Sequence, residues 1–382
     1  MKQSAKWIWQ HPKWPSFSWD VEPLAPLLRA CNQAQGQLLG MIGASGTDAN
    51  VERELDALLQ NVITSSAIEG EQLNVESVRS SLAKRLGLAS DERVTARSEG
   101  LAELMLDATQ QHDGPLTSER LMHWHRLLFP DTSALTARPI QVGTLRGPEP
   151  MQVVSGRIDR PVVHFEAPGR EGLEQKLDDF FYWFNSSHAD PTLDPLVRAG
   201  IAHFWFVTLH PFDDGNGRLT RAITDLAMAQ GEHQAIRFYA MSASILARRQ
   251  DYYRILEATQ RGGLNITEWL VWFLQTLLHT LEQAMQRIER VLAKARFWQA
   301  HRDDGLSAEQ IKVLNRLMNG DLLAEKPDSG FADGISAGQY QAVAKVSKAT
   351  ATRHLADLLA KGCLLKLPGG GRSTRYQINW PD

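Results

Sequence analysis

The 382-residue sequence has few cysteines, almost no net charge and no long apolar run. Its two cysteines, Cys31 and Cys363, are far apart and form no Cys-x-x-Cys pair. This spacing argues against a disulfide framework or a structural zinc site and favours a reducing compartment. The formal net charge of −3 predicts no general attraction to nucleic acid or to a membrane, so any such binding depends on a local patch.

No stretch of about 18 uninterrupted apolar residues is present, so we expect no membrane-spanning helix. The segment LNITEWLVWFLQTLLHTL carries Glu268 and Gln275 and is typical of an amphipathic core helix. The N-terminal stretch MKQSAKWIWQHPKW lacks the apolar run of a signal peptide. We therefore expect a soluble cytoplasmic protein that has no membrane partner.

Apolar residues recur at helical spacing along most of the chain, which predicts a mainly α protein. Helices are expected over 22–35, 48–66, 75–86, 91–111, 117–128, 173–184, 195–210, 218–231, 242–261 and 266–298. The runs MQVV and PVVHF, separated by SGRIDR, predict a β-hairpin between residues 151 and 165. The tryptophans of the N-terminal stretch are expected to pack onto the main domain.

The stretch HPFDDGNGRLTR, His210–Arg221, joins two apolar helices. Gly215 and Gly217 let the backbone turn its N–H groups inward. Such amides at a helix N-terminus form an anion site. Arg218 and Arg221 are three residues apart, so they share a helix face, and both can fork onto phosphate oxygens. The loop is therefore suited to binding phosphate.

His210 and Asp214 add groups that can act on a phosphate. The imidazole of His210 can accept a proton near neutral pH, and Asp214 can hold Mg²⁺, which takes one or two carboxylates plus substrate phosphates. Together these groups suit phosphoryl or nucleotidyl transfer. Taken singly, each residue is also typical of a structural turn or a solvated helix face. A zinc site formed by His203, His210 and Asp214 is a further alternative.

The same stretch matches the Fic motif, His-x-Phe-x-Asp/Glu-Gly-Asn-Gly-Arg-x-x-Arg, at every specified position. The chain thus resembles Fic proteins, most of which transfer AMP from ATP to a hydroxyl side chain of a target protein. The resemblance implies a mainly α fold, a Fic-type helical bundle with a β-hairpin flap. It also implies ATP as substrate, Mg²⁺ as cofactor and a protein target, the chain itself included.

The resemblance assigns a role to each position of the loop. His210 deprotonates the target hydroxyl, which attacks the α-phosphate, and Phe212 anchors the loop in the core. Asp214 carries Mg²⁺. The remaining motif positions bind the triphosphate, with the last at the γ-phosphate: Gly215, Asn216, Gly217, Arg218 and Arg221.

TSSAIEGE contains Ser65-x-x-x-Glu69-Gly70, which resembles the inhibitory motif Ser/Thr-x-x-x-Glu-Gly/Asn of Fic proteins with an N-terminal inhibitory helix. Here that helix spans residues from about 50 to 70. A carboxylate of Glu69 paired with Arg221 occupies the partner of the γ-phosphate and repels the phosphate itself. Ser65 is then expected to hydrogen-bond within the site. Read alone, the segment is a helix end with a glycine stop.

Two further groups are assigned by position in the family. The hairpin corresponds to the flap that holds the target segment by strand addition, and its candidate docking residues are Met151, Gln152, Val153 and Val154. Tyr252 and Tyr253, in RRQDYYRILEATQRG, resemble aromatic residues on the adenine side. The alternatives are a plain edge hairpin and two core tyrosines.

The resemblance divides the chain into three regions. Residues 1–45 form a Trp-rich region, and its stretch WIWQHPKWPSFSWD resembles a small domain of unknown function found ahead of many bacterial Fic domains. Residues 46–300 form the Fic domain with its inhibitory helix. Residues 301–382 begin with the charged linker HRDDG and resemble a winged helix-turn-helix domain.

The C-terminal region is predicted to place the start of SKATATRHLADLLAKG and a two-stranded wing against DNA. The candidate DNA contacts are Thr350, Thr352, Arg353 and Arg372. With eleven basic and nine acidic side chains in 301–382, the region is only weakly basic. The loop from 320 to 335 is longer than a tight winged helix needs, and winged helices also serve protein interaction and dimerisation. DNA, a protein and a homodimer all remain candidate partners.

Three functions follow from these patterns. The first is an autoinhibited, Mg²⁺-dependent protein adenylyltransferase that modifies a Ser, Thr or Tyr hydroxyl. The second is a DNA-binding transcriptional regulator in which the Fic domain senses nucleotide. The third is a Fic enzyme with another donor, a different nucleotide or a phosphocholine conjugate, or one that removes AMP with help from Glu69. The intact His210 and Asp214 favour catalysis over sensing.

Overall fold

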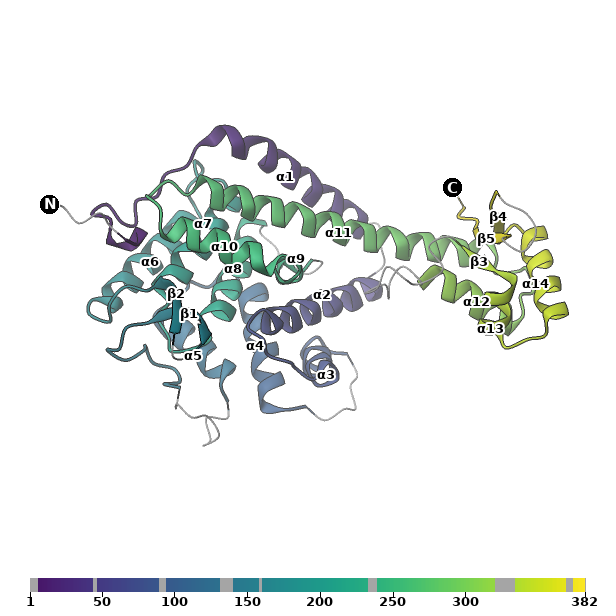
Figure 1. Ribbon diagram of the computed structural model, residues 1–382, viewed down its shortest axis with the longest axis horizontal. Helices are drawn as coiled ribbons and strands as arrows, with labels where there is room; N and C mark the ends of the chain where they lie inside the picture. Colours follow the sequence, from purple (N-terminus) through teal and green to yellow (C-terminus); the bar gives the residue numbers. More distant parts are fainter. Residues whose placement is uncertain are drawn as a thin grey trace. The chain divides into compact units, whose positions relative to one another are not determined.

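The computed structural model describes residues 6–43, 47–88, 94–130, 140–157, 160–232, 239–319, 334–368 and 374–381. The chain divides into two compact units, Met1–Met285 and Gln286–Asp382. Figure 1 labels the helices and strands of both units. No helix among the described residues is both long enough and apolar enough to cross a membrane.

The described residues of the first unit form helices and one β-hairpin (Figure 1). Its elements are η1 (Ile8–Gln10), α1 (Val21–Gly43), α2 (Thr47–Ile68), α3 (Val75–Arg85), α4 (Ala96–Gln110), α5 (Ser118–Leu128), β1 (Gln152–Arg157), β2 (Arg160–Glu166), α6 (Leu173–Ser187), α7 (Pro195–Leu209), α8 (Asn216–Glu232), α9 (Met241–Ala247), α10 (Arg249–Gln260) and most of α11 (Thr267–Ala300). The helical periodicity of the sequence is therefore confirmed, with one refinement. The expected helix over 242–261 is two helices, which break at Arg248.

The core of this unit is centred on α7, which is buried on all sides from Leu196 to Leu209. Asp194 begins the helix by accepting a hydrogen bond from the backbone N–H of Leu196. A side chain at Gly200 would collide with α11, because an ideal Cβ there would lie 2.8 Å from Leu270 Cδ2. Helix α8 packs against α7. The loop between α7 and α8 is thus fixed at both ends by buried helices.

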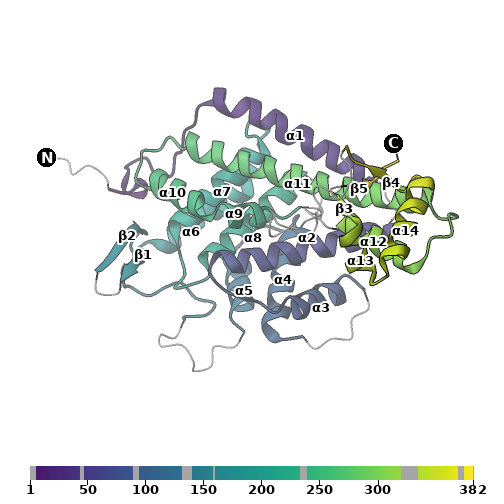
Figure 2. The ribbon, with the colours of Figure 1, turned by 45° about the vertical axis from the view of Figure 1, so that its right-hand side comes forward.

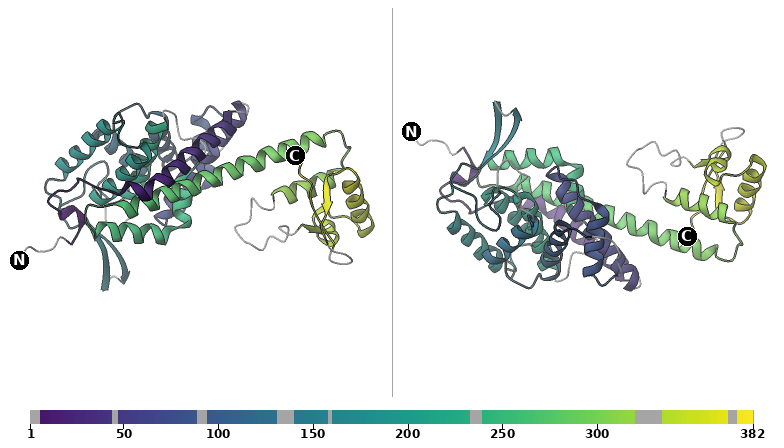
Figure 3. Two further views of the ribbon diagram at one scale, coloured as in Figure 1. Left: turned by 90° about the horizontal axis from the view of Figure 1, so that it is seen from above. Right: turned by 90° about the horizontal axis from the view of Figure 1, so that it is seen from below.

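The hairpin projects from the helical body (Figures 2 and 3). Strands β1 and β2 are antiparallel, with a register shift between Val153 and Val154. The base of the hairpin packs on the aromatic N-terminal stretch, because Trp7 lies edge-on to Phe165 with ring centroids 5.3 Å apart. Together with Trp14, which lies edge-on to Trp205, Trp7 packs onto the main domain as expected.

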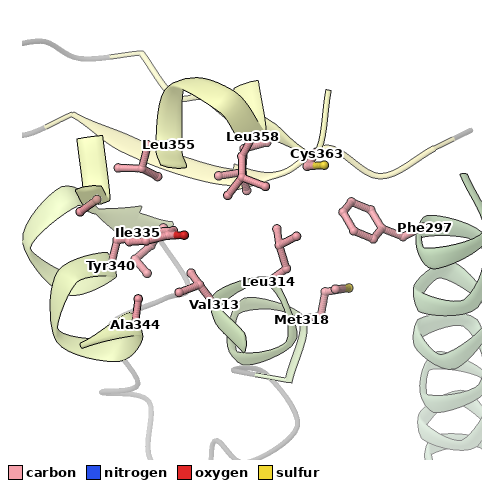
Figure 4. Packing of buried hydrophobic residues seen from close by; sticks show 12 residues of the cluster. Phe297, Val313, Leu314, Met318, Ile335, Tyr340, Ala344, Leu355, Leu358 and Cys363 are labelled. Carbon is pink, nitrogen blue, oxygen red and sulfur yellow. The ribbon is translucent and has the colours of Figure 1, made fainter. Parts of the chain in front are cut away.

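The second unit has its own small core, formed by helices and a three-stranded sheet (Figure 4). Its elements are the end of α11, α12 (Ala308–Asn319), β3 (Ile335–Ser336), α13 (Ala337–Ala344), α14 (Lys348–Ala360), β4 (Leu364–Lys366) and β5 (Arg375–Ile378). The sheet order is β3-β5-β4. The order of helices and the β4–β5 hairpin agree with the sequence pattern, whereas the two-residue strand β3 was not expected. The assignment as a winged helix stays a prediction.

Candidate active site

His210 is the residue that ends α7. It has a left-handed backbone, with φ 48° and ψ 57°, a conformation that non-glycine residues adopt rarely and at a cost. Its Nδ1 donates a hydrogen bond to the carbonyl oxygen of Val207 at 3.2 Å. Because a carbonyl can only accept, the proton of the neutral ring lies on Nδ1, and Nε2 keeps a free lone pair. Burial lowers the pKa of His210, so the ring is neutral at pH 7.

The loop after His210 is fastened by an amide and an aromatic stack. Asn216 accepts a hydrogen bond from the N–H of Phe212 at 2.9 Å and donates one to its carbonyl at 2.8 Å. The Phe212 ring stacks on His125, with centroids 4.1 Å apart. His125 accepts from the N–H of Gly143 at 2.9 Å and donates to the carbonyl of Asp214 at 3.2 Å. Burial lowers the pKa of His125 to about 4, so it acts as a neutral clamp.

Arg146 holds the first residues of the loop from the opposite side. Its Nε donates to the carbonyl of His210 at 2.9 Å, and its backbone N–H donates to that of Pro211 at 3.0 Å. Its Nη2 donates to the carbonyl of Pro168. The sequence reasoning missed both Arg146 and His125, because they lie outside the motif and no local pattern marks them.

The first turn of α8 is open on one side, and a carboxylate lies there. Gly215 has φ +82°, which turns the chain into the helix. An ideal Cβ on Gly217 would lie only 2.1 Å from Oε1 of Glu69, so Glu69 can lie there only because position 217 has no side chain. The side chain of Asp214 is 54% exposed, and its Oδ1 lies 3.6 Å from Arg218. This carboxylate faces solvent at the mouth of the loop.

Arg221 is held by the end of α2 and the residue that follows it, through three hydrogen bonds. Its Nε donates to the hydroxyl of Ser65 at 2.7 Å, and its Nη2 donates to the carbonyl of Ser65 and to Oε1 of Glu69, both at 2.8 Å. The arginine is 3% exposed. The structure therefore brings Ser65, Glu69 and Arg221 together as the sequence predicted, across more than 150 residues of chain.

The turn that ends α2 positions the carboxylates of both Glu69 and Glu71. Gly70 has φ +83°, its N–H donates to the carbonyl of Ala67, and the N–H of Glu71 donates to that of Ser66. This pattern is a Schellman motif with glycine at the position that needs the left-handed conformation. The expected glycine stop is thus confirmed.

Arg218 is paired with Glu71, which the sequence reasoning did not single out. Its Nη1 donates to Oε2 of Glu71 at 2.8 Å, and the other oxygen of Glu71 pairs with Arg97. The guanidinium of Arg218 lies 5.0 Å from the centroid of the Phe129 ring. Both arginines of the motif are thus engaged by carboxylates from the turn after α2.

The two tyrosines differ in accessibility. Tyr252 is 2% exposed, and its hydroxyl is hydrogen-bonded to Nε2 of His203 at 2.9 Å. Tyr253 is 37% exposed and donates to the carbonyl of Ile68 at 3.5 Å. The second ring nitrogen of His203 contacts the Thr224 hydroxyl at 2.9 Å. Because both nitrogens of this buried histidine have partners within the core, the zinc alternative is disfavoured.

The hairpin residues divide into two sets. Met151 and Val153 pack against the Trp7 cluster, whereas Gln152 and Val154 are exposed. Arg261, which directly follows α10, donates to the carbonyl of Val163 in β2 at 3.0 Å.

The candidate DNA residues lie at the start of α14. Thr352 and Arg353 are exposed, and Thr350 is half-buried with its hydroxyl 2.9 Å from that of Ser347. Arg372 lies outside the described residues.

Comparison with known proteins gives matches over two parts of the chain. A family model for the Fic/DOC family matches residues 115–228, and one for a domain of unknown function, DUF4172, matches residues 7–88. Two curated proteins, each named protein adenylyltransferase Fic, come from Drosophila sechellia and Drosophila melanogaster. Each is 26% identical over 215 residues, which cover 55% of this chain and 39% of the relative. The chain therefore spans about two fifths of the length of these relatives.

Among solved structures, the chain is similar to a Fic domain-containing signalling protein from Bacteroides thetaiotaomicron. The match has a TM-score of 0.50 at 17% identity and covers 68% of this chain and 97% of that chain. This likeness supports a fold of the Fic type for the part of the chain that it covers.

Proposed function

Because the chain carries a Fic/DOC domain and belongs to the Fic family, we propose that it is a protein adenylyltransferase that Glu69 holds in a restrained state. It transfers AMP from ATP to a Ser, Thr or Tyr hydroxyl of a protein, the chain itself included. The observation that carries the proposal is the intact loop from His210 to Arg221, whose last arginine is bonded to Ser65 and Glu69. The names of the curated relatives support the choice of reaction.

His210 is the base in this proposal. Its Nε2 takes the proton of the target hydroxyl, the hydroxyl oxygen forms a bond to the α-phosphorus, and the bond from that phosphorus to the α–β bridging oxygen breaks. Pyrophosphate leaves, and the proton resides on the imidazole. The neutral state of His210 and the Nδ1–H bond to Val207 support this role, because together they leave Nε2 as the accepting atom.

The triphosphate is bound by the first turn of α8 and by Arg218 and Arg221, which lie on the same helix face. Asp214 is suited to Mg²⁺, since it is a solvent-facing carboxylate beside these cationic groups. The ion supplies charge neutralisation for the phosphates when it is bound. The Glu69 carboxylate lies against Gly217, where an ideal Cβ would be 2.1 Å from its Oε1, so a phosphate held at Gly217 would meet a like charge there, which supports the restraint.

The hairpin docks the target in this proposal. A target strand would add to β1, since the carbonyl of Val163 in β2 is already bonded to Arg261. Gln152 and Val154 are then the exposed side chains that meet the target, and Met151 and Val153 anchor the hairpin from behind.

The donor is tested with a Glu69→Gly variant and nucleotides labelled at the α-phosphate. We expect transfer from ATP, and not from GTP, CTP or UTP, with the label on a hydroxyl residue identified by mass spectrometry. Label from another nucleotide would reassign the donor. Nucleotide binding without any transfer would favour the alternative, a nucleotide-sensing regulator, which a gel shift with DNA at low salt then tests.

A further inference from the structure

Glu71 is a second carboxylate at the phosphate-binding arginines. It follows Glu69 by two residues and lies at the last position of the Schellman turn after α2. One of its oxygens bonds Arg218 at 2.8 Å, and the other pairs with Arg97 of α4. Its side chain is 24% exposed, so the pair lies at the entrance to the loop and not in the deep core.

Arg218 has little freedom to serve a phosphate while Glu71 is present. The arginine is 6% exposed and rests on the Phe129 ring. Burial lowers the pKa of its guanidinium, and Glu71 is the nearest opposing charge that stabilises it. An anion that approaches Arg218 must therefore replace the carboxylate of Glu71 or share the guanidinium with a like charge.

We propose that Glu71 is a second restraint, which keeps Arg218 from the diphosphate part of a nucleotide as Glu69 keeps Arg221 from the γ-phosphate. The inference rests on the proposed function. Both carboxylates are placed by the same glycine turn, so a movement of the end of α2 removes them together. Glu69→Gly alone leaves Arg218 engaged, and full release requires that both carboxylates leave.

Nucleotide affinity tests the inference without relying on transfer. The dissociation constants of ADP and ATP are measured by calorimetry for the full chain with Glu71→Gln, Glu69→Gln or both changes. Asp56→Asn is the matched control, because it removes a carboxylate of α2, the helix before this turn, that pairs with Arg79 at 2.7 Å. Glu71→Asp keeps the charge but shortens the reach, so its affinities are expected to lie between those of wild type and Glu71→Gln.

Glu71→Gln is expected to tighten ADP and ATP alike, each on the order of tenfold. Glu69→Gln is expected to tighten ATP much more than ADP, since only ATP carries a γ-phosphate. An unchanged or weaker ADP affinity in a folded Glu71→Gln protein would show that Glu71 only positions Arg218, and would overturn the inference. If no variant binds either nucleotide, the proposed function fails as well, so the two failures are distinguishable.

An independent observation concerns the second unit, where His301, Asp304 and Cys363 converge. Their ligand atoms all lie within 4.8 Å of one another. Nδ1 of His301 is 2.7 Å from Oδ2 of Asp304 and 3.5 Å from Sγ of Cys363, and that sulfur is 4.0 Å from Oδ2. His301 follows α11 one turn after Phe297, and Cys363 lies on the adjoining side of the same small core (Figure 4).

These distances are close to the spacing between ligand atoms around a tetrahedrally coordinated ion. Bonds of 2.0–2.3 Å to nitrogen, oxygen and sulfur set the ligand atoms roughly 3.3–3.6 Å apart. The distance from Nδ1 of His301 to Sγ of Cys363, 3.5 Å, is already in this range. A shift of the Asp304 carboxylate by about half an ångström, away from His301 and toward Cys363, brings its distances to both atoms close to this range. Asp304 lies on a turn with its side chain 30% exposed, so it can move and can admit water as a fourth ligand.

We infer that this cluster is a Zn²⁺ site that fastens the end of α11 to β4. The mixed nitrogen, sulfur and oxygen ligands are those that zinc accepts. The sequence argument against structural zinc relied on the spacing of cysteines alone, whereas the fold brings a histidine and an aspartate to Cys363. Binding displaces the proton of the buried thiol.

Cobalt titration of the full chain, purified without a histidine tag and stripped of metal, tests the site. We expect a thiolate-to-cobalt charge-transfer absorption that Zn²⁺ displaces. It should persist in Cys31→Ser, which changes the other buried cysteine, and disappear in Cys363→Ser. Asp304→Asn, on the exposed turn, should weaken Co²⁺ binding at least tenfold. Absence of the band in wild type, or an equal band in Cys363→Ser, would contradict the site.

Discussion

Replacement of His125 by phenylalanine isolates the hydrogen bonds that hold the loop. In the wild-type protein the ring centroids of His125 and Phe212 are 4.1 Å apart, and the change keeps an aromatic ring against Phe212. It removes the ring nitrogen that accepts from the N–H of Gly143 and the ring N–H that donates to the carbonyl of Asp214. The buried N–H of Gly143 is then unpaired, which costs about 1–3 kcal/mol, and the half-buried carbonyl of Asp214 loses a bond worth about 1 kcal/mol. We expect a total destabilisation of about 2–4 kcal/mol.

For a unit of 285 residues, that loss corresponds to a fall in Tm of about 3–7 °C, measured by calorimetry. In a Glu69→Gly background, AMP transfer should fall on the order of a hundredfold, because the loop atoms are misplaced. His123→Phe is the control, since His123 is exposed on the same helix. Its ring is hydrogen-bonded to the carboxylate of Glu103, in α4, at 3.3 Å. If the free energies of unfolding of His125→Phe and His123→Phe differ by less than about 0.5 kcal/mol, the hydrogen bonds of His125 do not hold the loop.

Three further changes test the site. Ser65→Ala removes the 2.7 Å bond to Arg221 and should raise autoAMPylation roughly fivefold, whereas unchanged labelling would mean that Ser65 does not hold the helix. The transfer rate should be flat through neutral pH and fall only as acid protonates His210, since its folded pKa lies below the ordinary value; a fall that begins above that value would refute its assignment as a neutral base. Burial raises the pKa of Asp225 from 3.8 to about 7, so the folded state binds this proton more tightly and stability is lost as pH rises between these values. Urea unfolding of Asp225→Asn, in which Asn61 keeps a carbonyl partner, should lack that loss, and an equal pH dependence would contradict it.

Local patterns predicted most of the fold. The strongly apolar run PLVRAGIAHFWFVTLH predicted α7, which is buried on every side, and the loop residues followed from a motif in which order matters more than any single residue. Gly70 was recognisable as a helix stop because only a left-handed residue closes that turn. The break at Arg248 was not visible, since the residues on both sides favour a helix.

Contacts between distant segments were out of reach of this reasoning. His125 and Arg146 hold the loop between α7 and α8 through backbone carbonyls and an N–H, and such partners leave no trace in the sequence of the loop. The sequence reasoning did not single out Glu71, because its partners Arg218 and Arg97 are identified only when α4 and α8 lie beside the end of α2. Sequence thus specified the chemistry of the site, and the fold specified how its arginines are occupied.

The central claim is that an intact catalytic loop is held back by the contact between Glu69 and Arg221. The direct measurement is incorporation of α-labelled AMP from ATP into the full chain, compared for wild type, Glu69→Gly and Glu69→Gly with His210→Ala. We predict weak labelling of wild type, labelling increased roughly tenfold or more in Glu69→Gly, and none when His210 is also removed. Equal labelling of wild type and Glu69→Gly, or labelling that survives the loss of His210, would contradict the account.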